Sequence, residues 1–120
     1  MAIVLVVEDD IFIRQTLGWV LEDMGHNALA ARDLAEALAH LVTAQPIDAL
    51  FVDIRLNALA FGGYDVADKA IGFRPHLPVL YTSGRPLSNE MTERFVPGGC
   101  FLRKPYSSKQ IEIFITQALH

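Results

Sequence analysis

The chain has 120 residues, the size of one domain, and 52% of them are hydrophobic, with a mean hydropathy of +0.29. This apolar content is enough for a buried core, and it excludes an intrinsically disordered chain, which combines low hydrophobicity with high net charge. The net charge is −4 and no basic run is present. We therefore expect no nucleic-acid partner, because such a partner needs a cationic face.

The apolar run Ile3–Val7 predicts a strand that is buried on both faces. The run is too short to span a membrane, and it lacks the basic residues that open a signal peptide, so we expect a cytoplasmic protein with no membrane partner. Cys100 is the only cysteine and cannot form an internal disulfide. Its apolar neighbours predict that it is a buried packing residue.

The first half of the chain then alternates between helix and strand patterns. Apolar residues at helical spacing predict a helix that stops near Gly25: they are Ile13, Leu17, Val20, Leu21 and Met24. Residues 27–31 form a possible short strand. Asp33 and Glu36 have the spacing of a capping box, which predicts a second helix that closes before Pro46.

The second half continues this alternation. We expect strands over residues 47–54, 78–82 and 100–103, and helices over residues 64–73, 88–95 and from 107 onward. Ser107 caps the last helix, whose apolar face we expect to contain Ile111, Phe114, Ile115 and Leu119. Strands that alternate with helices predict an α/β fold, with a parallel sheet covered by helices on both faces. In such sheets, ligands bind beyond the carboxyl ends of the strands.

Polar side chains stand at four of these strand ends. Glu8 and Asp9 follow the first strand, Asp53 ends the third, Ser83 follows the fourth and Lys104 follows the fifth. Three carboxylates in one cleft repel one another, and a divalent cation that prefers oxygen ligands relieves that repulsion, so we expect Mg²⁺. Asp53 then acts as a carboxylate nucleophile toward a phosphoryl group, while Lys104 and Ser83 bind its oxygens.

These residues and their spacings resemble the five-point signature of response-regulator receiver domains over essentially the whole chain. The resemblance implies a flavodoxin-like (βα)5 fold, a doubly wound five-stranded parallel sheet in the order 2-1-3-4-5. It implies one receiver domain over residues 1–120, either alone or cut from a longer protein. It also implies magnesium-dependent phosphorylation of Asp53 by a histidine kinase or phosphotransfer protein, in a two-component or phosphorelay system. Such a domain is not an enzyme beyond its own phosphorylation and dephosphorylation.

The resemblance further implies metal ligation by Asp9, Asp53 and the backbone carbonyl of Arg55, with Glu8 acting through water. The peptide bond between Lys104 and Pro105 matches one that is usually cis in the family.

The family's switch residues also have counterparts. Ser83 matches the hydroxyl residue that moves toward the phosphoryl group, with Thr82 as runner-up, and Phe101 matches the switch aromatic. A downstream protein is expected to bind the face made by the fourth helix, fifth strand and fifth helix. Phe101 is as well explained by core packing as by switching.

Some residues depart from the family or favour another reading. Residues 57–63 form a longer connection than usual, and Asn57 stands where a proline is common. A small phosphatase of the haloacid-dehalogenase type needs a second aspartate two residues after the nucleophile, where this chain has Arg55. A receiver-like interaction module that is never phosphorylated stays open as an alternative. We expect Trp19 and Tyr106 to pack, and Asp10 to cap the first helix or to be solvated.

Overall fold

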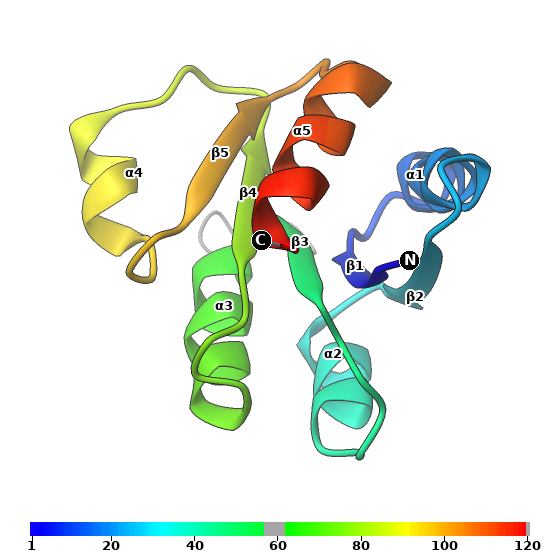
Figure 1. Cartoon of the computed structure of the whole chain (residues 1–120). Helices are drawn as coiled ribbons and strands as arrows, with labels where there is room; N and C mark the ends of the chain where they lie inside the picture. The colour runs from blue at the N-terminus through cyan, green and yellow to red at the C-terminus, as the bar shows by residue number, and fades with distance from the viewer. Residues whose placement is uncertain (57–61, 120) are drawn as a thin grey trace.

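The computed structural model describes residues 1–56 and 62–119. Within these residues, strands and helices alternate along the chain (Figure 1). The strands are β1 (Ile3–Val7), β2 (Asn27–Ala31), β3 (Ala49–Asp53), β4 (Val79–Ser83) and β5 (Cys100–Arg103). The helices are α1 (Ile11–Asp23), α2 (Leu34–Leu41), α3 (Gly62–Phe73), α4 (Asn89–Arg94) and α5 (Ser108–Ala118). No helix in the described part of the chain has the length and apolar character needed to cross a bilayer.

The five strands form one parallel sheet in the order β2-β1-β3-β4-β5, which confirms the expected fold class and strand order. The register brings the carboxyl ends of the strands to one edge. Val7 pairs with Val52, and Asp53 pairs with Thr82. Ser83 pairs with Arg103. Polar residues at or just after these positions therefore meet in space although they lie far apart in the sequence.

Each face of the sheet packs against its own pair of helices. On one face, β-strand residues pack with α2 and α3 around a cluster that includes Leu5, Leu50, Ala67 and Tyr81. On the other face, α1 and α5 pack against residues that include Val6, Phe51, Leu21 and Phe114. Figure 1 shows α2 and α3 on the side of the sheet away from α1 and α5. Burial on both faces explains why β1 is a continuous apolar run.

Side-chain caps define several helix ends. Ser107 and Gln110 form a reciprocal capping box at the start of α5. At α2 only half of the expected box is present. Asp33 accepts a hydrogen bond from the backbone N–H of Glu36, but the Glu36 carboxylate accepts from Arg32 instead of returning to Asp33. The Arg32–Glu36 ion pair explains this choice of partner.

Three packing predictions are wrong. Cys100 is exposed because it begins β5, which lies at the edge of the sheet. Trp19 is 63% exposed, since it lies two residues from Leu17 and about 200° around α1 from that buried position. Leu119 is 44% exposed because it is the C-cap of α5, beyond the apolar stripe. The connection predicted over residues 57–63 is too long at its end, because Gly62 and Gly63 already belong to α3. Its other residues, 57–61, lie outside the described part of the chain, and with them the prediction about Asn57.

Candidate functional site

Three acids meet at the carboxyl edge of the sheet. Glu8, Asp9 and Asp53 each offer a carboxylate oxygen, and these oxygens all lie within 4.8 Å of one another. The geometry follows from the sheet register, because Val7 and Val52 are partners in adjacent strands and Asp53 comes directly after Val52. Glu8 is buried, Asp53 is half-buried and Asp9 is exposed, so the cluster opens toward solvent on one side.

Lys104 joins the acids from the end of β5. Its Nζ lies 2.8 Å from Oε1 of Glu8 and 3.1 Å from Oδ2 of Asp53. The backbone N–H of Lys104 donates to the carbonyl of Ser83 at 2.8 Å, which ties the end of β5 to the end of β4. The peptide bond from Lys104 to Pro105 is cis, as the resemblance implies. One ammonium therefore bridges two carboxylates that are contributed by β3 and by the loop after β1.

Burial and close contact change the pKa values of Glu8 and Lys104. Glu8 is only 4% exposed, and its Oε2 has no hydrogen-bond partner among the described residues. Burial is the main cause that raises the pKa of Glu8 from 4.5 to about 8; its hydrogen bond to Asp53 adds to the rise, and Lys104 opposes it. Burial acts to lower the pKa of Lys104, but the neighbouring carboxylates outweigh it and the pKa is raised. Lys104 thus keeps its positive charge.

This donor set fits a hard divalent cation. Three acidic side chains meet one ammonium, and within the described part of the chain the buried Oε2 of Glu8 has no hydrogen-bond partner. Oxygen ligands without sulfur or imidazole favour Mg²⁺ or Ca²⁺ over zinc. The residues expected to hold Mg²⁺ are therefore consistent with such a site, although the metal itself stays a prediction.

The acids line a cleft of about 910 Å³, and Arg55, Ser83 and Lys104 are also among its lining residues. Ser83 is half-buried, and its Oγ accepts a hydrogen bond from the backbone N–H of Arg85 at 3.1 Å. Thr82 is 4% exposed and is not among the lining residues. The position of the hydroxyl in the cleft thus favours Ser83 over its neighbour.

Comparison with known proteins identifies the family. A family described as the response regulator receiver domain matches residues 4–116. The chain belongs to this receiver family. Receivers are domains of two-component signalling systems and are signalling domains rather than classical enzymes.

Relatives with longer chains contain a similar domain. The receiver is 28% identical over 117 residues to the nitrogen assimilation regulatory protein NtrX of Azorhizobium caulinodans, covering 97% of this chain and 26% of that protein. It is 31% identical over 115 residues to nodulation protein W of Bradyrhizobium diazoefficiens, covering 92% of this chain and 48% of that protein. The receiver therefore spans between a quarter and a half of these curated relatives.

Solved structures share the fold over nearly the whole chain. A response regulator receiver protein from Sinorhizobium medicae has a TM-score of 0.87 and 28% identity, with 98% of this chain and 94% of that chain covered. A receiver domain protein from Clostridium thermocellum has a TM-score of 0.88 and 26% identity, with 99% and 94% covered. These two chains, unlike the curated relatives, are about the length of the receiver.

The structure adds residues around the site that sequence reasoning missed. Arg14 of α1 donates from Nη1 to the backbone carbonyl of Glu8 at 2.7 Å and so holds the loop that carries the acids. The carboxylate of Asp10 accepts from the backbone N–H groups of Phe12 and Ile13, as expected of a helix cap. Its capping role explains why the third acid in this run does not join the cluster.

Gly63 is a second residue that the sequence analysis did not assign to the site. Its N–H donates to the carbonyl of Ile54 at 2.8 Å, and a methyl group at Gly63 would lie 2.2 Å from the backbone oxygen of Asp53. The first turn of α3 therefore packs backbone to backbone against the end of β3. A glycine followed by a buried helix was the available signal, but its meaning depended on this close approach.

Phe101 is half-buried and belongs to an aromatic group beneath α4. Its ring lies 6.3 Å from that of Phe95, whose ring stacks on Tyr81 at 4.2 Å. Tyr106 packs against the opposite cluster, with α1 and α5, which agrees with a structural role.

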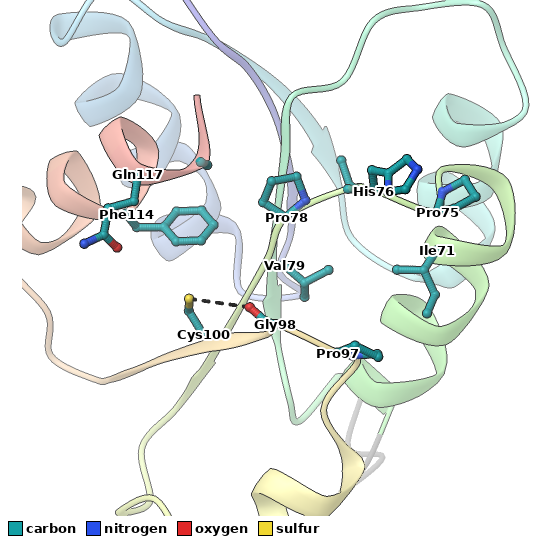
Figure 2. Close-up of a pocket in the computed structure, with 12 residues that line it drawn as sticks. Ile71, Pro75, His76, Pro78, Val79, Pro97, Gly98, Cys100, Phe114 and Gln117 are labelled. Carbon is teal, nitrogen blue, oxygen red and sulfur yellow. Dashed lines mark hydrogen bonds between the residues drawn. The ribbon is translucent and has the colours of Figure 1, made fainter. Parts of the chain in front are cut away.

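A second cavity, of about 560 Å³, lies at the opposite end of the sheet, near the first residues of β4 and β5 (Figure 2). In Figure 2, Ile71 of α3 faces it from one side and Phe114 of α5 from the other, and the thiol of Cys100 points to the carbonyl of Gly98. Among the described residues, no aspartate or glutamate lines this cavity. It is therefore separate from the acid cluster and offers no comparable chemistry.

Proposed function

We propose that this receiver accepts a phosphoryl group on Asp53 from a histidine kinase or a phosphotransfer protein. The observation that carries the proposal is the contact of Lys104 with both Asp53 and buried Glu8, beside Asp9. Phosphoryl transfer is accelerated mainly by positioning and by neutralising charge. A carboxylate at the mouth of a cleft, with a fixed cation beside it, supplies both.

In the proposed reaction, one Asp53 carboxylate oxygen forms a bond to phosphorus while the phosphorus–nitrogen bond of the donor histidine breaks. The electron pair of that bond returns to the imidazole, and an acyl phosphate remains on Asp53. A magnesium ion held by Asp9, Asp53 and the Arg55 carbonyl, with Glu8 through water, would neutralise the oxygens of the transferring group.

Lys104 supports the product as well as the reactant. Its ammonium lies 3.1 Å from Oδ2 of Asp53, close enough to bind a phosphoryl oxygen carried by that residue. The contact of Lys104 with Glu8 would hold the ammonium in place when Asp53 becomes phosphorylated. Ser83 supplies a hydroxyl donor from the other side, after its side chain turns from the N–H of Arg85.

The proposed output is a change in protein binding at the face made by α4, β5 and α5. The motivation is that no residue of α4 is buried, while Ile113 of α5 leaves 47% of its apolar side chain exposed. Ser83 and Phe101 would link this face to the phosphoryl group. Relatives are named as a nitrogen assimilation regulatory protein and a nodulation protein. These names support a regulatory output for the protein binding proposed here.

Intact-mass measurement tests the assignment. The protein is incubated with a small phosphodonor such as acetyl phosphate, with and without magnesium. The wild type should gain one phosphoryl group only with magnesium, Asp53→Asn should gain none, and the matched variant Asp65→Asn, altered on the exposed side of α3, should behave as wild type. Equal labelling of Asp53→Asn would contradict the proposal, and no labelling of the wild type would favour the unphosphorylated interaction module.

A further inference from the structure

Helix α4 is attached to the protein mainly through the residues that end and follow it. None of its six residues is buried, and only Met91 packs partly against the core. The next residues behave differently: Phe95 is half-buried and Val96 is 5% exposed. The position of α4 therefore depends on the contacts of Arg94, Phe95 and Val96.

Tyr81 of β4 holds two of these residues. The Phe95 ring stacks on the Tyr81 ring with centroids 4.2 Å apart and planes 10° apart. The backbone N–H of Val96 donates to the Tyr81 hydroxyl at 2.9 Å in a buried setting. Tyr81 is fully buried, so this is a rigid anchor for the segment after α4.

Tyr64 of α3 holds the third residue and connects it to the acid cluster. The guanidinium carbon of Arg94 lies 4.6 Å from the centroid of the Tyr64 ring, a cation–π contact. Tyr64 comes directly after Gly63, whose backbone packs against Asp53 and Ile54. Tyr64 and Arg94 both line the cleft that contains Asp53, so the contact lies between the proposed phosphorylation site and α4.

We propose that Arg94 couples the state of the cleft to the position of α4, by resting on Tyr64 in the unphosphorylated protein and turning toward an anionic phosphoryl group on Asp53. This inference rests on the proposed function. A cation–π contact of this kind shifts a population by a factor of about 2 to 30. A charge-assisted hydrogen bond to a phosphoryl oxygen is of comparable or greater strength, so an exchange between the two partners is energetically accessible.

The coupling through Tyr64 and Arg94 follows a different route from the coupling through Ser83 and Phe101. It begins at the first turn of α3 and reaches the end of α4 through a charged side chain, whereas the other passes from β4 to β5. The two routes meet at Phe95, which stacks on Tyr81 and lies 6.3 Å from Phe101.

The test uses beryllium fluoride with magnesium as a phosphoryl mimic, and records backbone amide spectra by NMR. In the wild type, the mimic should shift the amides of Ile54 and of α4. Arg94→Gln removes the charge from an exposed side chain and should leave the Ile54 shift intact while it removes most of the α4 shift. Without the mimic, this variant should also speed hydrogen exchange at Thr92 and Val96 by about 2- to 30-fold. Arg103→Gln, an exposed arginine at the end of β5, is the matched control and should behave as wild type.

The outcomes separate this inference from the proposed function. An α4 response in Arg94→Gln equal to that of the wild type would overturn the coupling while leaving phosphorylation of Asp53 in place. The coupling would also be overturned if the mimic shifts the Ile54 amide signal of the wild type but leaves its α4 amide signals unchanged. A wild type that does not take up the mimic at all would contradict the proposed function, and the inference with it.

Discussion

Replacing Gly63 by alanine should destabilise the receiver far more than a surface methyl group would. The added carbon would lie 2.2 Å from the Asp53 carbonyl oxygen and 2.7 Å from the Ile54 Cα, whereas non-bonded carbon contacts are comfortable at about 3.5–4.0 Å. Both obstacles are backbone atoms of the β3 end, so no side chain can turn aside. The first turn of α3 must then move by about 1 Å or more.

The magnitude follows from two costs and one gain. Overpacking of this kind costs about 1–3 kcal/mol. The movement also weakens the 2.8 Å bond from the Gly63 N–H to the Ile54 carbonyl, and an unsatisfied buried donor costs about 1–3 kcal/mol. Alanine in place of glycine within a helix returns about 0.5–1 kcal/mol. The free energy of unfolding should therefore fall by roughly 1–5.5 kcal/mol.

Urea unfolding followed by far-ultraviolet circular dichroism measures this change. Gly72→Ala is the matched control, because it lies in the same helix and a methyl group there would meet no atom within 4 Å. The control should be stabilised by about 0.5–1 kcal/mol. If Gly63→Ala unfolds within 0.5 kcal/mol of the wild type, the close approach of α3 to β3 does not constrain the protein as reasoned.

Three further predictions concern the cleft and its switch. Because burial raises the pKa of Glu8 to about 8, the folded protein binds more protons than the unfolded chain between pH 4.5 and 8, and stability should fall as pH rises through that window. In thermal melts without divalent metal, Glu8→Gln should make the melting temperature depend less on pH in this window. The same dependence on pH in the variant as in the wild type would mean that the pKa of Glu8 is not raised. Asp9→Asn removes one of three clustered carboxylates, so it should raise the metal-free stability by about 0.2–1 kcal/mol and reduce the gain in melting temperature on adding magnesium. That account fails if millimolar magnesium leaves the wild-type melting curve unmoved. Phe101→Ala should keep phosphorylation of Asp53 but weaken the α4 amide response to a phosphoryl mimic, and a response like that of the wild type would make Phe101 a packing residue only.

The alternation of strands and helices and the candidate residues at the strand ends could be predicted from the amino-acid sequence alone. Hydrophobic periodicity and capping residues are local signals, so Ile3–Val7 and the Ser107 cap could be placed without knowledge of the rest. Once the sheet was expected to be parallel, Asp53 and Lys104 had to lie at the same edge. Chain connectivity and strand direction are sufficient for that conclusion.

Which surfaces are covered, and which distant residues are in contact, depends on how the helices and strands pack in three dimensions. Cys100 and Trp19 lie in segments of the expected type, yet both are exposed, because burial depends on whether another element packs over that face. Arg94 and Tyr64 lie 30 positions apart in the sequence, and their contact joins α4 to α3. The close approach of Gly63 to Asp53 likewise depends on how α3 packs against β3. No local pattern specifies such contacts, because they arise from how separate elements pack together.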